Sequence, residues 1–189
     1  MTSESIFEEL YATPVIMAIK NNKDFNKCLE SENKIVFVLY GNLETIPLIV
    51  KKLKTHGKIV IVHEDLIEGL SSSTFAASFI KKYTEADGII STKPANVIYA
   101  RKLGLFAVLR FFVFDSISYE NMKQTIKDIN CDVIEILPGI MPNMIVDIKK
   151  RTNTPIVAGG LISSKEEVMD AINSGALAIS SSNYNVWQM

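Results

Sequence analysis

Short apolar segments recur along the chain with helix-forming segments between them, and this alternation restricts the fold more than any other feature of the sequence. Most of these segments are apolar along their whole length, which is typical of parallel strands that are covered on both faces. We therefore expect eight strands, at Val15–Ile19, Ile35–Tyr40, Ile59–His63, Gly88–Ser91, Leu105–Arg110, Val133–Leu137, Ile156–Ala158 and Ala176–Ser180.

Capping residues support the helices expected between these strands. Asp115 precedes one helix, Pro94 suits the first turn of another, and Ser164 with Glu167 fits a capping box. The expected helices are Lys23–Ser31, Leu43–Leu53, Thr74–Thr84, Ala95–Leu103, Ser116–Ile129, Pro142–Arg151 and Ser164–Asn173, with a short one at Tyr184–Gln188.

Eight strand and helix units in a chain of 189 residues favour a single α/β domain, residues 1–189, folded as a short (βα)8 TIM-type barrel. TIM barrels commonly have ~250 residues, so loops and helices are expected to be short. An open, flavodoxin-like sheet is the alternative, and the number of strands makes it the weaker one.

Composition and charge restrict the classes of protein to which this chain can belong. Hydrophobic residues make up 48% and charged residues 22%, values typical of globular chains. The net charge of −1 gives no overall positive field, so nucleic-acid binding would depend on local basic clusters. Cys28 and Cys131 form no metal-binding motif, and we expect neither a metal nor a cofactor. Without a signal-peptide pattern or an apolar stretch near the ~20 residues of a membrane span, a cytoplasmic protein without membrane contact is expected.

Two loops near the C-terminus are rich in small residues. Gly159 and Gly160 follow the seventh expected strand, and Ser181 and Ser182 follow the eighth. Glycine lets backbone N–H groups approach an anion, and a helix start adds a partial positive charge. Because TIM barrels commonly bind phosphate at these two loops, the pair predicts a small phosphorylated ligand. The alternative is two tight turns with no ligand.

Polar residues also follow the third and fourth strands. Alternation places His63 and Asp65 on one side of the chain and Glu64 on the other. His63 and Asp65 are candidates for a ligand site at the carboxyl ends of the strands. Loop solvation with a helix cap near Ser71–Ser73 is the alternative. Lys93 is a further candidate for contact with an anion, although a solvated loop lysine is the commoner case.

Arg110 and Glu135 interrupt the fifth and sixth strands. A guanidinium or a carboxylate that is buried without a partner is costly, so each needs an opposite charge or several hydrogen bonds. We expect the two residues to pair across neighbouring strands. The pair is either structural or part of a polar centre that receives ligand hydroxyl groups.

Basic clusters end several expected helices. The C-terminal ends of all helices in a (βα)8 barrel point to the face opposite the ligand site. The clusters would therefore form a positive ring on that face, able to contact a nucleic-acid backbone. The attraction of cations to helix C-termini, roughly 0.3–1 kcal/mol each, explains the same pattern without RNA. The candidate RNA-binding residues are Lys51, Lys52, Lys81, Lys82, Lys149, Lys150 and Arg151.

Six segments between about residue 60 and the C-terminus resemble, in order and spacing, the glycerol-uptake operon antiterminator proteins of bacteria. The most specific are Glu-Ile-Leu-Pro-Gly at 135–139 and Ala-Gly-Gly-Leu-Ile at 158–162. Two positions depart from the pattern: Ser73–Thr74 replaces an acidic residue, and Ser181 replaces threonine. The other matching segments are 63–71, 87–93, 110–116 and 180–183, the last together with Trp187.

The resemblance implies a TIM-type barrel that senses glycerol 3-phosphate, binds the leader of a glycerol-gene messenger RNA and prevents premature termination. No catalytic residue is expected, and a homo-oligomer is compatible with the sequence. By the same likeness, the phosphate would be held by Gly159, Gly160 and Ser181, and the glycerol end lined by His63, Asp65, Arg110 and Glu135.

An enzyme of the same fold is the alternative function. It would hydrolyse a glycerophosphodiester, with a divalent cation held by Glu64, Asp65 or Glu135, or it would isomerise a triose phosphate. Glu135 next to Arg110 would be a poor general base, because a neighbouring cation lowers the pKa of a carboxyl group. A scaffold without a ligand fits poorly with polar groups at so many strand ends.

Overall fold

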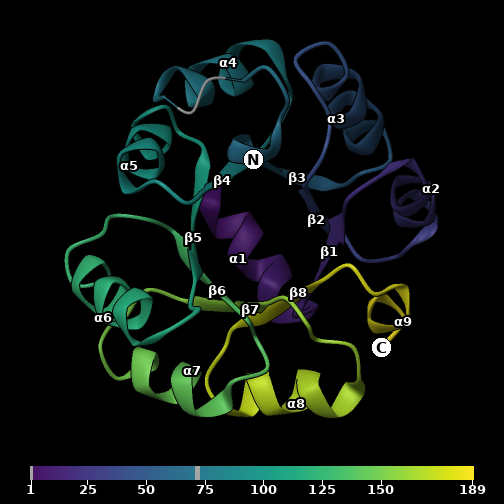
Figure 1. Ribbon diagram of the computed structural model, residues 1–189. Helices are drawn as coiled ribbons and strands as arrows, with labels where there is room; N and C mark the ends of the chain where they lie inside the picture. Colours follow the sequence, from purple (N-terminus) through teal and green to yellow (C-terminus); the bar gives the residue numbers. More distant parts are fainter. Residues whose placement is uncertain (1, 71–72) are drawn as a thin grey trace.

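The computed structural model describes residues 2–70 and 73–189. Eight strands pair in the order of the chain, all in parallel, and β1 pairs with β8 to close a barrel (Figure 1). The strands are β1 (Val15–Ile19), β2 (Ile35–Val38), β3 (Ile59–His63), β4 (Gly88–Ser91), β5 (Phe106–Phe112), β6 (Val133–Leu137), β7 (Ile156–Gly159) and β8 (Ala178–Ser181).

Helices surround the barrel, and the predicted (βα)8 fold is confirmed (Figure 1). The predicted caps at Asp115 and Ser164 are present as capping boxes, and α5 begins at Pro94. The helices are α1 (Ser3–Ala12), α2 (Asn22–Glu30), α3 (Ile46–Thr55), α4 (Phe75–Tyr83), α5 (Pro94–Lys102), α6 (Ser116–Thr125), α7 (Pro142–Lys149), α8 (Lys165–Asn173) and α9 (Tyr184–Trp187), with a 3-10 turn, η1, at Glu64–Leu66.

Some boundaries differ from the sequence predictions. β2 ends at Val38 instead of Tyr40, because Gly41 takes a φ of 120° and turns the chain. β5 continues to Phe112, which pairs with Leu137 of β6. α6 ends at Thr125, four residues earlier than predicted, and turns follow it. The cap predicted near Ser71–Ser73 involves residues 71 and 72, which lie outside the described part of the chain.

Alternation along the strands divides the core into two apolar layers. Residues such as Val60, Val62 and Ile89 point outward and pack under the helices. Residues such as Ile61 and Val108 point inward and fill the barrel. Burial of apolar surface on both faces is the main contribution to stability, and it explains why the strands are apolar along their length.

Helix α1, which the sequence did not predict, closes the N-terminal end of the barrel. Ile6 and Leu10 are buried in the inner layer, and Figure 1 shows α1 crossing the centre of the ring of strands. Phe7 contacts the ring of Phe106, the first residue of β5, with the centroids 5.4 Å apart. A ligand can therefore reach the barrel interior only from the other end, where the strands finish.

Two further observations concern the described residues. None of their helices is long and apolar enough to cross a membrane. Both cysteines are buried free thiols, and no cluster of three or more His, Cys, Asp or Glu side chains among these residues is arranged to hold a metal ion.

Candidate ligand-binding site

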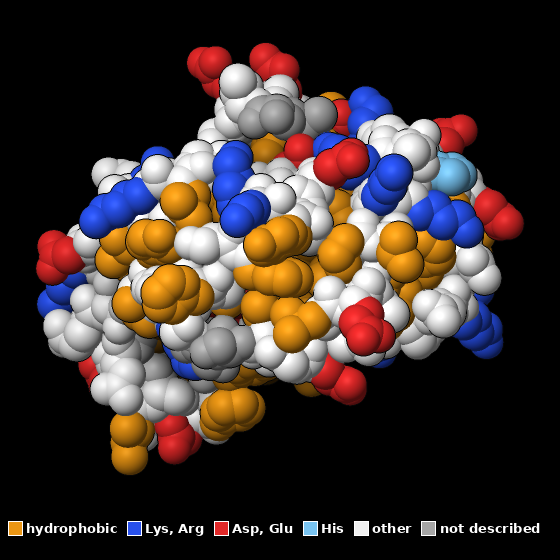
Figure 2. Space-filling model, turned by 90° about the horizontal axis from the view of Figure 1, so that it is seen from above, with side chains coloured by type: hydrophobic (Ala, Val, Ile, Leu, Met, Phe, Trp, Pro, Cys, Tyr) orange, Lys and Arg blue, Asp and Glu red, His pale blue; other side chains and the backbone are white. Residues whose placement is uncertain are grey.

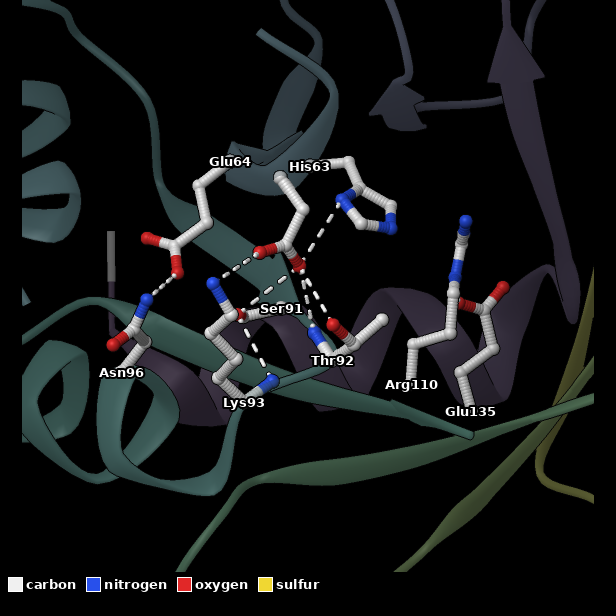
Figure 3. A network of polar contacts seen from close by, with 9 residues as sticks. His63, Glu64, Ser91, Thr92, Lys93, Asn96, Arg110 and Glu135 are labelled. Atoms are coloured by element: carbon white, nitrogen blue, oxygen red, sulfur yellow. Dashed lines mark hydrogen bonds and ion pairs between the residues drawn. The ribbon is translucent and has the colours of Figure 1, made fainter. Parts of the chain in front are cut away.

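A polar layer lies on top of the apolar interior, at the carboxyl ends of the strands. Along β3 the inward positions are Ile59, Ile61 and His63, so the last inward residue is polar. The same alternation ends with Arg110 on β5 and with other polar side chains on β6 and β8. Figure 3 shows His63, Arg110 and Glu135 grouped at this level. The inward polar residues are His63, Arg110, Glu135 and Ser180, all of them buried.

Glu135 is the centre of this layer. Arg110 Nε donates a hydrogen bond of 2.5 Å to Glu135 Oε2, which confirms the predicted pair, and Ser180 Oγ donates one of 2.6 Å to Oε1. Gly159 completes the packing, since a Cβ there would lie 2.7 Å from both Glu135 Oε1 and Ser180 Oγ. Only glycine fits at this position, and the carboxylate is held on three sides.

Arg110 has donors left over after it pairs with Glu135. Its Nη1 and Nη2 groups make no hydrogen bond to any residue that the structure describes, and the side chain is 5% exposed. Figure 3 shows the guanidinium extending past Glu135 towards the level of His63. These N–H groups are therefore available to an acceptor that enters from the mouth of the barrel.

His63 is neutral in this setting. Burial, with a further contribution from the positive charge of Arg110, lowers the pKa of His63 from 6.5 to about 3. Its Nδ1 atom is buried and has no hydrogen-bond partner among the described residues, and Asp65 Oδ2 is 3.8 Å away. A neutral imidazole can donate to or accept from a ligand hydroxyl group.

Asp65 lies at the rim, in the turn η1 that follows β3. Its Oδ2 atom accepts hydrogen bonds from Ser91 Oγ at 3.2 Å and from the backbone N–H of Thr92 at 2.8 Å. Its Oδ1 atom is 4.0 Å from Nζ of Lys93, whose side chain is 44% exposed. Asp65 therefore ties the turn after β3 to the end of β4, and its Oδ1 atom is buried with no hydrogen-bond partner among the described residues.

Glu64 was missed as a buried group by the sequence analysis, although alternation placed it correctly on the opposite side from His63. It lies between the barrel and α5, where Asn96 Nδ2 donates a hydrogen bond of 2.5 Å to Oε1 (Figure 3). Burial raises the pKa of Glu64 from 4.5 to about 7. A single acidic residue in a loop gave no sign of this burial, because the sequence does not show how closely α5 packs.

The two loops predicted to bind phosphate lie side by side. Ser181 Oγ donates a hydrogen bond of 2.8 Å to the carbonyl of Ile162, in the loop after β7. Asn183 N–H donates to Ser181 Oγ at 3.1 Å, and Trp187 Nε1 donates to the Ser181 carbonyl at 2.7 Å. The Ser181 side chain thus joins the loops, and its hydroxyl proton is already used within the protein.

Backbone N–H groups remain free on both loops. Gly160 has a φ of 75°, a left-handed conformation that glycine adopts easily. Neither the N–H of Gly160 nor that of Ser182 donates in any of the loop and turn hydrogen bonds between the described residues. Buried or half-buried N–H groups normally have a partner, so these two are donors for a ligand or for water.

The rim beside the polar layer is apolar. Phe112 and Phe114, after the end of β5, are 40% and 84% exposed, and their rings stack with centroids 5.7 Å apart. A neighbouring cavity of about 420 Å³ is lined mainly by apolar groups, including Phe114, Tyr119 and Met141. It offers few donors for a phosphate, so the mouth of the barrel is the better candidate for an anionic ligand.

The candidate RNA-binding residues lie at the opposite end of the barrel from this site, at or just after the ends of α3, α4 and α7. Figure 2 views the side that carries α4 and shows Lys and Arg side chains gathered above a band of hydrophobic ones. Not every cation of this region is free, since Lys54 pairs with Asp87 and Arg101 with Asp132. The candidates themselves are distributed as Lys51 and Lys52 in α3, Lys81 and Lys82 in α4, and Lys149, Lys150 and Arg151 at the end of α7.

The fold and the site together define a (βα)8 barrel with a polar layer of side chains and two small-residue loops at the carboxyl ends of its strands. The model of the family described as glycerol-3-phosphate responsive antiterminator matches residues 15–187. The chain belongs to this family, which confirms the resemblance inferred from its motifs.

Two solved structures agree with this assignment, and the chain is also similar to a curated relative of uncharacterized function. The glycerol uptake operon antiterminator regulatory protein of Listeria monocytogenes is 34% identical, with a TM-score of 0.89 over 92% of this chain and 94% of that one. A glycerol uptake operon antiterminator-related protein of Thermotoga maritima is 33% identical, with a TM-score of 0.83 over 94% and 99%. The uncharacterized protein YgcP of Escherichia coli is 43% identical over 180 residues, 95% of this chain and 94% of the relative.

Proposed function

We propose that this chain binds glycerol 3-phosphate at the mouth of its barrel and, in that state, binds the leader of a messenger RNA of glycerol metabolism and prevents termination. The family supports a role as an antiterminator. The observation that carries the ligand proposal is the hydrogen bond from Ser181 Oγ to the carbonyl of Ile162, which joins the two loops that contain Gly160 and Ser182.

The phosphate would be bound by backbone N–H groups at this pair of loops. The N–H groups of Gly160 and Ser182 would donate to it, with Gly159 leaving space for a close approach. Ser181 would act through its position, because its hydroxyl donates to Ile162. This assigns to Ser181 a role in joining the loops, in place of the direct contact that the resemblance implied.

The glycerol hydroxyl groups would meet the inward polar layer. Neutral His63 and the free N–H groups of Arg110 offer both donors and acceptors, and Asp65 offers an acceptor at the rim. Lys93 would add a long-range positive charge close to Asp65. Glu135 would hold Arg110 in place and would leave contact with the ligand to Arg110.

A regulator fits this geometry better than an enzyme. Both oxygens of Glu135 already accept hydrogen bonds, from Arg110 and Ser180, so the carboxylate is engaged within the protein. Within the described residues, Glu64 turns away from the mouth towards Asn96 and does not join Asp65 and Glu135 in a cation site. Ligand control of RNA binding requires that glycerol 3-phosphate bind the RNA-competent form more tightly than the other form.

Thermal unfolding with small phosphates tests the ligand. Glycerol 3-phosphate at a hundred times its dissociation constant is expected to stabilise the protein by about 2.7 kcal/mol, with little effect of glycerol or inorganic phosphate alone. Ser182→Pro removes one N–H donor and should weaken this response, whereas Ser182→Ala keeps the donor and should preserve it. An equal response of all three compounds, or none, would contradict the proposed site.

A further inference from the structure

The ring of cations opposite the ligand site is hollowed at one place. A cavity of about 390 Å³ lies between the ends of α6 and α7, at the base of the barrel. It is lined by Ile126, Lys127 and Ile129 from the segment after α6 and by a continuous run that begins at the last residue of α7. The residues of this run are Lys149, Lys150, Arg151, Thr152, Asn153 and Thr154.

Positive charge dominates the hollow. Arg151 donates two hydrogen bonds of 3.0 Å to Asp147, which fixes the guanidinium and leaves its remaining N–H groups unused. Lys149 and Lys150 form no ion pair with any residue in the described ranges, and the stem of Lys149 packs close to Gly175. Asp147 pairs with Arg151 and so offsets one of the four cations of the lining.

Neutral donors complete the lining. The Thr152 hydroxyl oxygen accepts from the N–H of Thr154 at 3.1 Å, so its own proton is free to be donated. Asn153 and Thr154 add an amide and a hydroxyl group. The attraction of cations to helix C-termini explains lysines at the ends of α6 and α7, but it explains neither the hollow nor these neutral donors. Cations with hydroxyl and amide donors are the groups that contact phosphate oxygens of nucleic acids.

We infer that this hollow, rather than the whole ring of cations, binds the phosphodiester backbone of the RNA; the inference rests on the proposed function. No aromatic side chain lines the cavity, so it lacks a platform on which bases could stack. It therefore contributes affinity and position and leaves the choice of sequence to other contacts. This inference adds Lys127 to the candidate RNA-binding residues. It gives a smaller contribution to RNA affinity to Lys51, Lys52, Lys81 and Lys82.

Charge-neutralising variants test the location. Lys127→Gln, Lys149→Gln and Lys150→Gln are combined in one protein, and affinity for the leader RNA is measured with saturating glycerol 3-phosphate over a range of salt concentrations. Each lost phosphate contact on a single strand lowers the slope of log affinity against log salt by about 0.7, so a decrease of about two is expected. The affinity at low salt should fall by about tenfold or more, by a similar factor for unrelated RNA sequences.

Two matched proteins serve as comparisons. Lys81→Gln with Lys82→Gln alters the ring away from the hollow, and Lys20→Gln with Lys23→Gln alters the ligand-site end; both should retain affinity within about twofold. The response of thermal unfolding to glycerol 3-phosphate should be unchanged in all three variants. Protection of Lys127 and Lys150 by RNA against an amine-reactive reagent gives a second readout on the unmodified protein.

The outcomes separate the two proposals. If the unmodified protein binds leader RNA but the Lys81 and Lys82 variant loses as much affinity as the hollow variant, binding is spread over the ring and the inference is wrong. The same conclusion follows if RNA leaves Lys127 and Lys150 unprotected. If the unmodified protein binds no leader RNA with or without ligand, the proposed function itself fails.

Discussion

At the scale of single residues, Glu135 shows what the sequence reveals and what it leaves open. A carboxylate and a guanidinium inside apolar strands predicted the Glu135–Arg110 pair, because neither charge can be buried alone. Nothing in the sequence indicates that Ser180 donates to the second oxygen or that Gly159 packs against both side chains. These contacts depend on the barrel bringing β8 next to β7, which only the closed structure establishes.

Arg110 should be essential for stability because of its partner. Arg110→Gln leaves the Glu135 carboxylate buried without a cation and is expected to cost about 3–5 kcal/mol in chemical denaturation. In the double variant Arg110→Gln with Glu135→Gln no charge remains, so most of this loss should be recovered. A double variant as unstable as the single one would show that shape, rather than charge, governs this pair.

Gly159 should tolerate no side chain. In Gly159→Ala the new Cβ would lie 2.7 Å from Glu135 Oε1 and from Ser180 Oγ, so the strands must shift. We expect a loss of about 1–3 kcal/mol and weaker binding of glycerol 3-phosphate. Gly104→Ala, where a Cβ meets open space but a φ of 72° disfavours alanine, is the control: it should lower stability and leave ligand binding unchanged.

Glu64 should make stability depend on pH near neutrality. The folded protein keeps the Glu64 proton up to a pKa of about 7, whereas the value for an ordinary glutamate is 4.5. The stabilising effect is therefore complete below pH 4.5 and is lost as the pH rises through 7. Relative to Glu64→Gln, the free energy of unfolding of the native protein should fall by about 3 kcal/mol across this pH range, as measured by urea denaturation.

His63 has the opposite dependence, which distinguishes the two groups. Its pKa of about 3 in the folded protein is below the ordinary 6.5, so its contribution to stability is present above pH 6.5 and is lost as the pH falls towards 3.

A Glu64→Gln variant whose stability followed the same pH profile as the native protein would contradict the prediction for Glu64. It would mean that Glu64 is ionised in the folded state.

At the scale of elements, the strands and most helices could be predicted because each has a strong local signal. Val133–Leu137 is apolar apart from Glu135, and Ser164 with Glu167 begins α8 as a capping box. Helix α1 could not be predicted in this way, because its short apolar pattern has meaning only against the open end of the barrel. The ends of β2 and β5 likewise depend on turns and on partner strands.

The side chains of α1 that enter the barrel should be important for stability. Ile6→Ala or Leu10→Ala creates a cavity below the inner layer, and each change is expected to cost about 2–5 kcal/mol in chemical denaturation. Glu4→Ala on the exposed side of the same helix should change stability by less than about 0.5 kcal/mol. Small effects of both apolar changes would indicate that α1 leaves the barrel in solution.

At the scale of the whole molecule, closure of the barrel followed from counting repeated strand and helix units, and it placed the site and the cations at opposite ends. The sequence could not show which cations are used internally. Lys54 and Arg101 look equivalent to Lys52 and Lys150 in the sequence, but pairing with Asp87 and Asp132 fixes the first two. Nor could it show the hollow between α6 and α7, which depends on how two helix ends are spaced.

Coupling between the two ends should be reciprocal. If glycerol 3-phosphate raises affinity for RNA by some factor, saturating RNA must raise affinity for glycerol 3-phosphate by the same factor. Trp187 is the one tryptophan in the chain and donates to the Ser181 carbonyl, so its fluorescence can report on ligand binding. Equal ligand affinity with and without RNA would exclude ligand control of RNA binding.

The seal formed by α1 has a consequence for how such coupling could work. Because one end of the barrel is closed, ligand and water exchange through the other end alone. No continuous path of solvent through the barrel connects the two ends. Ligand binding at the open end can therefore affect the basal cations only through small displacements of the strands and of the helices packed around them.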